Sequence, residues 1–331
     1  MSAPLLEVED LRKTFVVRRG FPRTETVRVQ ALSGISFRVG EGEAFGLVGE
    51  SGCGKSTAGR ALLRLIDPDG GRVLFRGEDF LSAPPRRLRE LRRKLQIVFQ
   101  DPFASLNPRR SVGKTLAEPM FVHGIGDKAE IARRVAAVLD EVGLPRDAAE
   151  KYPHEFSGGQ RQRIGIARAL VLEPDLIVAD EPVSALDVSI QAQILLLLDR
   201  LKERRGLGFV FISHDLGVVR HFCRRVAVMY LGRIVEDGPA ERIFDEPLHP
   251  YTRALRDASP VPDPRAKVTM ARLEGEVASA INPPQGCHFH PRCPHAMDRC
   301  RVEYPALTEP VAGRRVACHL YPADAAGSAA A

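Results

Sequence analysis

Short apolar runs bounded by polar residues predict the strands of this chain. Residues 44–48, 176–179 and 209–212 are continuously apolar, as expected of parallel strands buried on both faces. Shorter runs lie between basic or Gly/Pro-containing turns and cover residues 5–11, 33–39 and 72–75. The first set predicts the parallel sheet of an α/β fold, and the second predicts a small antiparallel layer beside it.

Apolar residues at helical spacing predict helices between these strands. Leu88, Leu91 and Leu95 recur along residues 86–95, with arginines between them. A solvated helix face explains these arginines better than a nucleic-acid patch does. The other predicted helical stretches cover residues 58–66, 160–170 and 115–142, the last with Ile131, Val135, Val138 and Leu139 on one side.

A glycine-rich segment between the strand at 44–48 and the helix at 58–66 carries the most specific motif. Residues 49–57 match G-x-x-x-x-G-K-S/T, the phosphate-binding loop, without a mismatch. Its glycines allow positive φ, so that backbone N–H groups can surround an anion at the start of a helix. Lys55 can reach the β- and γ-phosphates of a nucleotide, and the Ser56 hydroxyl can ligate Mg²⁺.

Two adjacent carboxylates follow the apolar run at 176–179. Ligands of open α/β sheets bind at the carboxyl ends of strands, where Asp180 and Glu181 fall. We expect Asp180 to hold Mg²⁺, directly or through water, and Glu181 to polarise a water molecule aimed at the γ-phosphate. An Asp-Glu pair alone is weak evidence, and it gains weight here from the phosphate-binding loop.

A second helix N-terminus suited to anions is predicted at Ser157-Gly158-Gly159-Gln160, just before the helix at 160–170. One chain cannot easily bring two such anion sites to the same phosphate.

Four of the six cysteines cluster near the C-terminal end, at positions 287, 293, 300 and 318. In a reducing compartment such a group more often binds a metal than forms disulfides. The spacing contains no C-x-x-C pair, and His288, His290, His295 or His319 could replace a thiolate. Zinc, an iron–sulfur cluster and free thiols all remain possible interpretations. Cys53 lies beside Lys55 near a helix N-terminus, which favours a thiolate, with a small packing residue as the alternative.

The composition of the chain restricts which classes of protein it can belong to but does not indicate a function. The chain has 331 residues and a formal charge of +6, which permits contact with nucleic acid or an anionic membrane face but requires neither. Residues 1–10 lack the pattern of a secretory signal, and the apolar runs are too short to span a bilayer. We therefore expect a soluble protein that relies on other polypeptides for any pore.

The order of these segments resembles the nucleotide-binding subunit of an ABC transporter. The segments that carry the resemblance, over residues 5 to about 255, are 49–57, Gln100-Asp101-Pro102, 156–160, Asp180-Glu181, 184–187 and His214-Asp215. The resemblance implies an ABC cassette with a RecA-like parallel core, an antiparallel β subdomain and a helical signature subdomain near residues 101–168. We expect the ATPase domain to cover residues 1–258, a Cys-rich extension 259–322, and a disordered tail 323–331.

The resemblance also implies roles for individual residues. Gln100 would ligand Mg²⁺ and link the metal site to the helical subdomain, and His214 would contact the γ-phosphate and steady the attacking water. Phe15 would stack on the adenine, with a core phenylalanine as the alternative. The implied catalytic residues are Lys55, Gln100, Glu181 and His214, and the implied Mg²⁺ ligands are Ser56, Gln100 and Asp180. The implied ATP contacts in the loop are Gly49, Glu50, Ser51, Gly52, Cys53, Gly54, Lys55, Ser56 and Thr57, and the implied D-loop is Ser184, Ala185, Leu186 and Asp187.

In this family each ATP lies between the phosphate-binding loop of one subunit and the signature turn of the other. Ser157, Gly158, Gly159 and Gln160 would therefore contact ATP bound to a partner ATPase, in a homo- or heterodimer. Phe156 stands where the family usually has leucine.

A narrower resemblance points to oligopeptide and dipeptide importers. Residues 100–108, 154–156 and 249–251 resemble that branch, and 52–54 and 211–215 resemble the second, F-type, of its two ATPases. Such a system implies two permease subunits, an extracytoplasmic substrate-binding protein, and a peripheral location on the cytoplasmic face of the cell membrane. Some relatives hold a 4Fe–4S cluster on four cysteines of the extension.

Three alternatives stay open on the sequence. Nickel importers share much of the pattern. Non-transport ABC ATPases that act on ribosomes or DNA usually carry two cassettes or a long coiled-coil insertion, which this chain lacks, and we expect no nucleic-acid partner. A P-loop kinase is disfavoured by residues 156–160 and His214.

Overall fold

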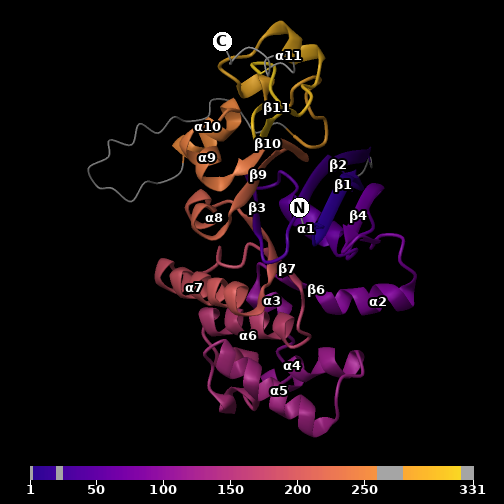
Figure 1. Cartoon of the computed structure of the whole chain (residues 1–331). Helices are drawn as coiled ribbons and strands as arrows, with labels where there is room; N and C mark the ends of the chain where they lie inside the picture. Colours follow the sequence, from indigo (N-terminus) through magenta and orange to yellow (C-terminus); the bar gives the residue numbers. More distant parts are fainter. Residues whose placement is uncertain (1–2, 20–24, 259–278, 322–331) are drawn as a thin grey trace. The chain divides into compact units, whose positions relative to one another are not determined.

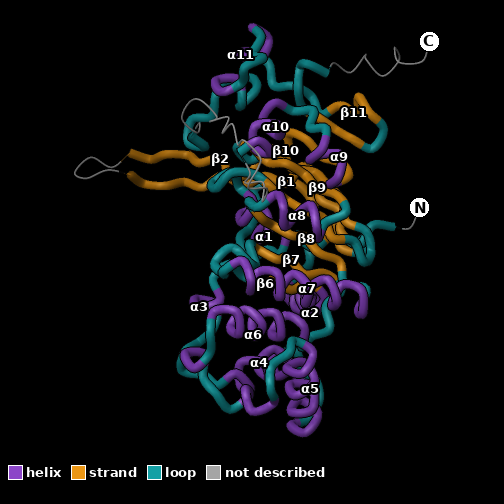
Figure 2. The backbone as a smooth tube through the Cα atoms, turned by 90° about the vertical axis from the view of Figure 1, so that its left-hand side faces the viewer, coloured by secondary structure: helices purple, strands orange, loops and turns teal. Residues whose placement is uncertain are grey.

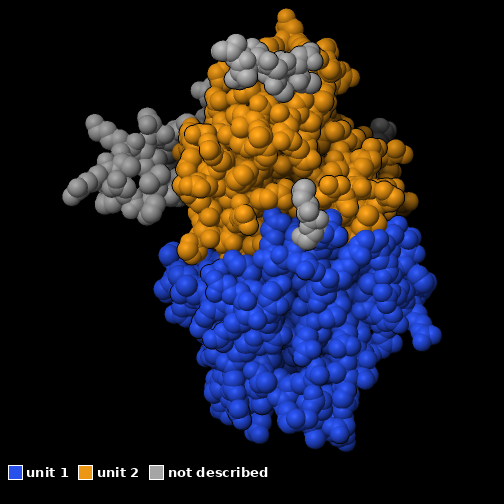
Figure 3. Space-filling model, in the orientation of Figure 1, with its two compact units in different colours: residues 1–5, 39–43, 75–212 blue, residues 6–38, 44–74, 213–331 orange. Residues whose placement is uncertain are grey.

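The computed structural model of the chain describes residues 3–19, 25–258 and 279–321. The chain forms two compact units (Figure 1, Figure 3). Unit 1 comprises residues 1–5, 39–43 and 75–212, and unit 2 comprises residues 6–38, 44–74 and 213–331. The predicted linker at 260–264 and the predicted tail at 323–331 lie outside the described residues, and the predicted domain boundary at 258 stays a prediction.

Unit 1 is built on three parallel strands. β7 (Leu176–Asp180) pairs with β6 (Leu95–Val98) and with β8 (Gly208–Ser213). Every residue of β7 and β8 is buried, which explains their continuous apolar sequence. Both strands predicted for this unit are confirmed, each one or two residues longer than expected.

The other elements of unit 1 are mostly helical. They are β5 (Glu78–Asp79), α2 (Pro85–Lys94), α3 (Pro102–Ser105), α4 (Val112–Val122), α5 (Lys128–Glu141), the 3-10 turns η1 (Arg146–Ala149) and η2 (Pro153–Glu155), α6 (Gly158–Leu170) and α7 (Val188–Arg205). In both Figure 1 and Figure 2, α4, α5 and α6 lie together, and α6 also contacts β6.

The helical stretch predicted at 115–142 is wrong as one continuous helix, because α4 and α5 are separate. Gly124 and Gly126 have φ values of 64° and 70°, which a right-handed helix does not contain. Asp127 then caps α5, because its side chain accepts the Glu130 N–H at 2.8 Å. The apolar periodicity hid the break because both helices pack against α6.

Unit 2 contains the remaining strands in two groups. β2 (Glu25–Val39), β1 (Leu6–Arg19) and β4 (Gly70–Phe75) are neighbours in one sheet, and β1 and β2 run side by side over most of their length (Figure 2). The other group has the order β11 (Thr308–Val311), β12 (Arg314–Val316), β10 (Arg233–Pro239), β9 (Arg225–Tyr230) and β3 (Ala44–Val48). β3 and β9 are parallel, and β9, β10, β12 and β11 pair antiparallel. The strand predicted at 44–48 is thus parallel to its neighbour β9 as expected, and the antiparallel strands β10, β12 and β11 make this group mixed.

The helical elements of unit 2 are shorter. They are α1 (Lys55–Leu62), α8 (Leu216–Phe222), α9 (Ala240–Asp245), α10 (Pro250–Asp257), the 3-10 turn η3 (His290–Arg292) and α11 (Asp298–Val302). We call the described residues 279–321 the C-terminal extension.

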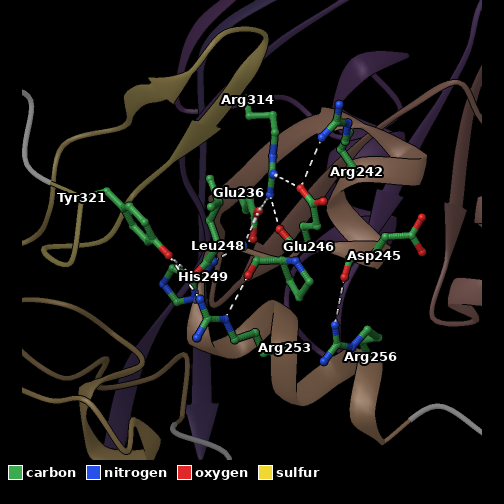
Figure 4. A network of polar contacts seen from close by, with 11 residues as sticks. Glu236, Arg242, Asp245, Glu246, Leu248, His249, Arg253, Arg256, Arg314 and Tyr321 are labelled. Atoms are coloured by element: carbon green, nitrogen blue, oxygen red, sulfur yellow. Dashed lines mark hydrogen bonds and ion pairs between the residues drawn. The ribbon is translucent and has the colours of Figure 1, made fainter. Parts of the chain in front are cut away.

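A buried ion pair ties the C-terminal extension to β10 (Figure 4). The Glu236 carboxylate accepts the backbone N–H groups of Leu248 and His249, both at 2.9 Å, and Arg314 Nη2 at 3.2 Å. The side chains of Glu236 and Arg314 are 0% and 4% exposed. Removing one partner of such a pair leaves a buried charge uncompensated, which costs about 3–5 kcal/mol. The extension is therefore an integral part of unit 2.

Candidate functional site

The phosphate-binding loop predicted at 49–57 leaves β3 and enters α1. Gly49 and Gly54 have φ values of 153° and 107°, which L-residues rarely adopt. A Cβ at Gly49 would lie 2.3 Å from the Met229 carbonyl oxygen, and a Cβ at Gly54 would lie 2.3 Å from the Ala31 carbonyl oxygen. Glycine is required at both positions because the loop passes against the backbones of β9 and β2.

The first turn of α1 is open to an anion. Gly54 stands at the N-cap in a left-handed conformation, and it has no side chain with which to cap the helix. The first turn also contains no acidic residue. Helix N-termini carry unpaired N–H groups and the positive end of the helix dipole, so this turn favours a phosphate.

Lys55 is placed to compensate negative charge at the loop. Its side chain is buried, and its ammonium donates to the carbonyl oxygens of Gly49 at 2.8 Å and Glu50 at 2.9 Å. These carbonyl contacts hold the ammonium across the loop. A phosphate oxygen is a stronger acceptor for this charged donor than a carbonyl oxygen is.

The thiolate interpretation of Cys53 is wrong. The Cys53 Sγ lies 3.8 Å from Lys55 Nζ, as the sequence suggested. Burial nevertheless raises the pKa of the Cys53 thiol above its ordinary value, because desolvation outweighs the nearby ammonium. Cys53 is therefore a neutral packing residue at neutral pH.

Glu50 connects the loop to two residues that the sequence did not single out as functional. The Glu50 N–H donates to the Tyr251 hydroxyl at 2.9 Å. Its carboxylate accepts both terminal nitrogens of Arg292, at 2.9 and 3.1 Å, and this hydrogen-bonded pairing raises the pKa of Arg292. Arg292 is 242 residues away in sequence, so no spacing motif could have found it. Tyr251 falls inside the predicted His249-Pro250-Tyr251 segment, which was the only signal available.

The two predicted carboxylates stand at the carboxyl end of β7 in unit 1. Asp180 is buried, and Glu181 follows it with a φ of 48°, in the left-handed region. A non-glycine residue held there costs about 1–3 kcal/mol, and such strain often marks functional sites. The Glu181 N–H donates to the Ile212 carbonyl oxygen at 3.0 Å, which holds the backbone in place.

Gln100 contacts Glu181 directly. Gln100 Nε2 donates to Glu181 Oε2 at 2.8 Å, across 81 residues of sequence. The structure thus brings together two residues that the sequence predicted to act in one site. The Gln100 side chain is exposed and Glu181 is half-buried, so this hydrogen bond lies close to the protein surface.

The signature turn begins α6 as predicted, with Ser157 at the N-cap. Ser157 Oγ accepts the Gln160 N–H at 3.4 Å, and Gln160 Oε1 accepts the Ser157 N–H at 3.0 Å. This is a capping box, and both side chains are exposed. Gly159 is buried, and a Cβ there would lie 2.5 Å from Ile190 Cγ2 of α7.

The predicted D-loop connects Glu181 to α7. Ser184 Oγ donates to the Glu181 carbonyl oxygen at 3.1 Å. Asp187 caps α7 by accepting the Ile190 N–H at 3.0 Å, and such backbone hydrogen bonds lower the pKa of its carboxyl group. Ala185 is exposed and Leu186 is half-buried.

The last predicted nucleotide contacts, His214 and Phe15, belong to unit 2. His214 is exposed just after β8, and Asp215 caps α8 by accepting the Gly217 N–H at 2.8 Å. Phe15 is half-buried in β1, with the Lys13 ammonium 5.5 Å from the ring centroid. The predicted residues therefore fall into two sets, one in each unit, and within unit 1 Glu181 contacts both Gln100 and Ser184.

The predicted metal site in the C-terminal extension is not supported. Within the described residues, no three His, Cys, Asp or Glu side chains are placed to hold a metal ion. Burial raises the pKa of the Cys287 and Cys318 thiols to about 11, and electrostatic interactions of Cys318 with Cys287, Cys293 and Cys300 place the four side chains in one region. Three of the four predicted alternative ligands have other contacts. His288 packs against Tyr304, His290 Nδ1 lies 2.9 Å from the Cys287 carbonyl oxygen, and His319 Nε2 lies 3.0 Å from that of Glu303.

None of the helices in the described part of the chain combines the length and the apolar character needed to cross a bilayer.

Two family models match the chain. The model described as ABC transporter matches residues 32–184, which include the phosphate-binding loop, the signature turn and Glu181. The model described as oligopeptide/dipeptide transporter, C-terminal region, matches residues 235–300.

Similar proteins agree with these matches. The chain is 53% identical to a probable peptide ABC transporter ATP-binding protein of Sinorhizobium fredii, over 97% of this chain and 91% of that protein. It is 50% identical to an oligopeptide transport ATP-binding protein of Bacillus subtilis, over 96% and 97% of the two chains. Among solved structures, an ATP-binding cassette in a dimeric post-hydrolysis state with ADP and Pi matches with a TM-score of 0.62 and 28% identity, over 71% of this chain and 98% of that one.

Proposed function

Because the chain belongs to the ATP-binding proteins of peptide ABC transporters, we propose that it binds and hydrolyses ATP to drive peptide import through permease partners. It is an ATPase of the ABC cassette type. The peptide cargo is assigned from the relatives' names and from the C-terminal family match. A nickel importer and a non-transport ATPase are not favoured by these relatives.

The phosphate-binding loop supplies the grip on the triphosphate. The uncapped start of α1 and the buried Lys55 ammonium support binding of the β- and γ-phosphates. Phe15 would stack on the adenine, and His214 would hold the γ-phosphate and the attacking water.

Glu181 is the proposed general base. Its hydrogen bond to Gln100 and its constrained left-handed backbone support a fixed carboxylate that orients a water molecule. This contact is the observation that carries the hydrolytic part of the proposal.

Three side chains of suitable chemistry would hold Mg²⁺. The Ser56 hydroxyl, the Gln100 amide oxygen and the Asp180 carboxylate are oxygen ligands of the kind that Mg²⁺ prefers. When bound, this ion neutralises charge that develops on the transferred phosphoryl group.

The proposed active form is a head-to-tail pair of ATPase subunits. Ser157, Gly158, Gly159 and Gln160 would contact the ATP of the partner subunit, identical or different. A cassette similar in structure has been solved as a dimer, which supports this arrangement.

A permease contact is proposed on the helical part of unit 1. An apolar cavity of 410 Å³ lies between α4, α5 and η1, lined in part by Ala117, Ile131 and Val135. The Phe121 side chain, also on its wall, is 60% exposed. An exposed apolar surface of this kind suits a cytoplasmic segment of a permease subunit. We therefore place the protein at the cytoplasmic face of the cell membrane, under a permease fed by an extracytoplasmic substrate-binding protein.

Glu181→Gln tests the proposal. We expect ATP affinity close to that of the unmodified protein and a loss of turnover of about 100-fold or more, because only the base is removed. Phosphate release and equilibrium ATP binding measure the two effects. ATP-dependent peptide uptake by vesicles that contain the full transporter should fall with turnover.

Glu173→Gln is the matched control. Glu173 is also a left-handed glutamate in unit 1, with φ of 53°, but it pairs with Arg134 on the surface. Its variant should keep full turnover. Full turnover in Glu181→Gln, or an equal loss in both variants, would contradict the assignment of the base.

A further inference from the structure

The C-terminal extension reaches the phosphate-binding loop through one charged side chain. Arg292 forms two hydrogen bonds to the Glu50 carboxylate, at 2.9 and 3.1 Å, and its side chain is 4% exposed against 22% for Glu50. We propose that Arg292 is a positioning residue for ATP binding, which acts on the nucleotide through Glu50 and not by direct contact. This inference rests on the proposed ATP site.

The extension holds Arg292 rigidly. Phe289, three residues earlier, is 1% exposed, and its ring centroid lies 5.4 Å from those of both Tyr230 and Tyr251. The Arg292 N–H donates to the Phe289 carbonyl oxygen at 3.0 Å. This aromatic packing fixes the backbone that carries Arg292. The planar guanidinium therefore loses little entropy when it pairs with the Glu50 carboxylate.

All three polar groups of Glu50 are engaged inside unit 2. Its N–H donates to the Tyr251 hydroxyl at 2.9 Å, its carbonyl oxygen accepts from Lys55 Nζ at 2.9 Å, and its carboxylate accepts from Arg292. Lys55 is itself the residue expected to bind phosphate. The position of Glu50 therefore influences the ammonium and the entrance of the loop together.

Charge gives Arg292 a second effect. A carboxylate inside a phosphate-binding loop opposes a polyanionic ligand, and the partial burial of Glu50 limits screening by solvent. The Arg292 guanidinium neutralises this carboxylate at short range. Without Arg292, the loop would keep its hydrogen bond to Tyr251 and its glycines, so its backbone conformation would persist. The Glu50 carboxylate would then be an uncompensated negative charge beside the ATP site.

The test is a charge cycle on the full-length protein. Arg292→Met should raise the Kd for ATP about tenfold, which equals about 1.4 kcal/mol, and should raise the Kd for ADP less. Glu50→Gln serves as the second background of the cycle, in which Arg292→Met should raise the Kd for ATP much less than tenfold. The double variant Glu50→Gln/Arg292→Met should recover most of the lost affinity, because the opposing charge is gone.

Arg299→Met is the matched control in the same extension. Arg299 pairs with Glu303 on the surface, where both side chains are more than half exposed. Its variant should bind ATP like the unmodified protein. Melting temperatures of all variants identify any loss of folding, and KM is expected to change more than kcat.

Two results would overturn the inference. One is unchanged ATP affinity in Arg292→Met. The other is a double variant that binds as weakly as Arg292→Met, which would mean that Arg292 acts only as packing. If the unmodified protein itself failed to bind ATP, the proposed function would fail first, so the two failures are distinguishable.

Discussion

Two helices of this protein begin at glycine-containing turns, and their first turns differ. α1 starts after Gly54 with no side-chain cap, beside the buried Lys55. α6 starts at Ser157 with a complete capping box from Ser157 and Gln160. The first turn of α1 is prepared for an anion, whereas the first turn of α6 already has its own acceptors.

This difference suggests separate roles for the two turns in the proposed site between two subunits. A phosphate at α1 meets open N–H groups and a positive side chain at once. A phosphate at α6 must compete with the Ser157 and Gln160 contacts, of which one is long at 3.4 Å. We expect α1 to bind nucleotide in a single chain, and α6 to contribute only when a partner's ATP is delivered to it.

The largest expected effect is at the turn before α1. Gly54→Ala would bring a Cβ to 2.3 Å from the Ala31 carbonyl oxygen at a φ of 107°, so the loop must move. We expect ATP affinity to fall about 100-fold or more and stability to fall by about 3 kcal/mol. Isothermal calorimetry and chemical denaturation measure these losses.

Gly52→Ala is the matched control, because a Cβ there would have no described atom within 4 Å. Its φ of 81° should cost only about 1–2 kcal/mol. Equal losses in both variants would mean that backbone strain, and not the close approach to β2, requires glycine in this loop.

A smaller effect is expected at the turn before α6. Ser157→Ala should leave ATP binding by the single chain unchanged and lower turnover about tenfold, since only the shared site is affected. The loss of the cap itself should cost about 1 kcal/mol. Binding and phosphate release measured on the same sample separate the two.

Ser111→Ala controls for the cap, since Ser111 Oγ accepts the Lys114 N–H of α4 at 3.4 Å, the same distance as in α6. It should lose similar stability and keep turnover. Weakened ATP binding by single chains of Ser157→Ala would remove the contrast between the two turns.

The smallest expected effect is on stability at low pH, through His249, which lies next to the loop contact Tyr251. His249 Nδ1 accepts the Tyr251 N–H at 3.0 Å, and burial lowers the pKa of His249 from 6.5 to about 3. Between these values the unfolded chain binds a proton that the folded chain does not, so stability falls as pH decreases below 6.5. In this range, one such histidine lowers the free energy of unfolding by about 1.4 kcal/mol for each unit that the pH falls.

His249→Asn keeps a cap for α10 but does not titrate. We expect it to lose about 1 kcal/mol less than the unmodified protein between pH 6 and pH 5, by urea denaturation at each pH. His221→Asn, at an exposed position of α8, should follow the unmodified protein. Parallel curves for His249→Asn and the unmodified protein would exclude His249 as a source of acid sensitivity.

Local chemistry in the sequence was enough to predict the buried strands and the polar motifs. β3, β7 and β8 lie where continuous apolar runs predicted them, and Asp180 and Glu181 follow β7 as expected. Such features depend on short-range patterns: full burial on both strand faces, glycine at a forced turn, and carboxylates after a strand. Gln100, which only the family resemblance pointed to, is hydrogen-bonded to Glu181.

Features that depend on distant residues were missed. Much of β1 and β2 was not predicted. In β2, Val27 and Val29 do alternate with Arg28 and Gln30, and this signal was missed. In β1, the exposed Val16 beside the half-buried Phe15 gives no clear alternation, and pairing with β2 supplies the order. The Arg292–Glu50 pair is set by how the extension folds back on the loop. The predicted metal site of the extension stays unsupported, because among the residues that the structure describes no three His, Cys, Asp or Glu side chains are placed to hold an ion.

The pairing of β12 with β10 has a consequence beyond nucleotide chemistry. β12 occupies one long side of β10, where unpaired N–H and C=O groups would otherwise form an open sheet edge able to join a neighbouring molecule. A chain truncated after α10 would expose that edge and strand the Glu236 carboxylate in an apolar interior. We therefore expect a chain shortened in this way to be less stable and to aggregate more readily than the full chain.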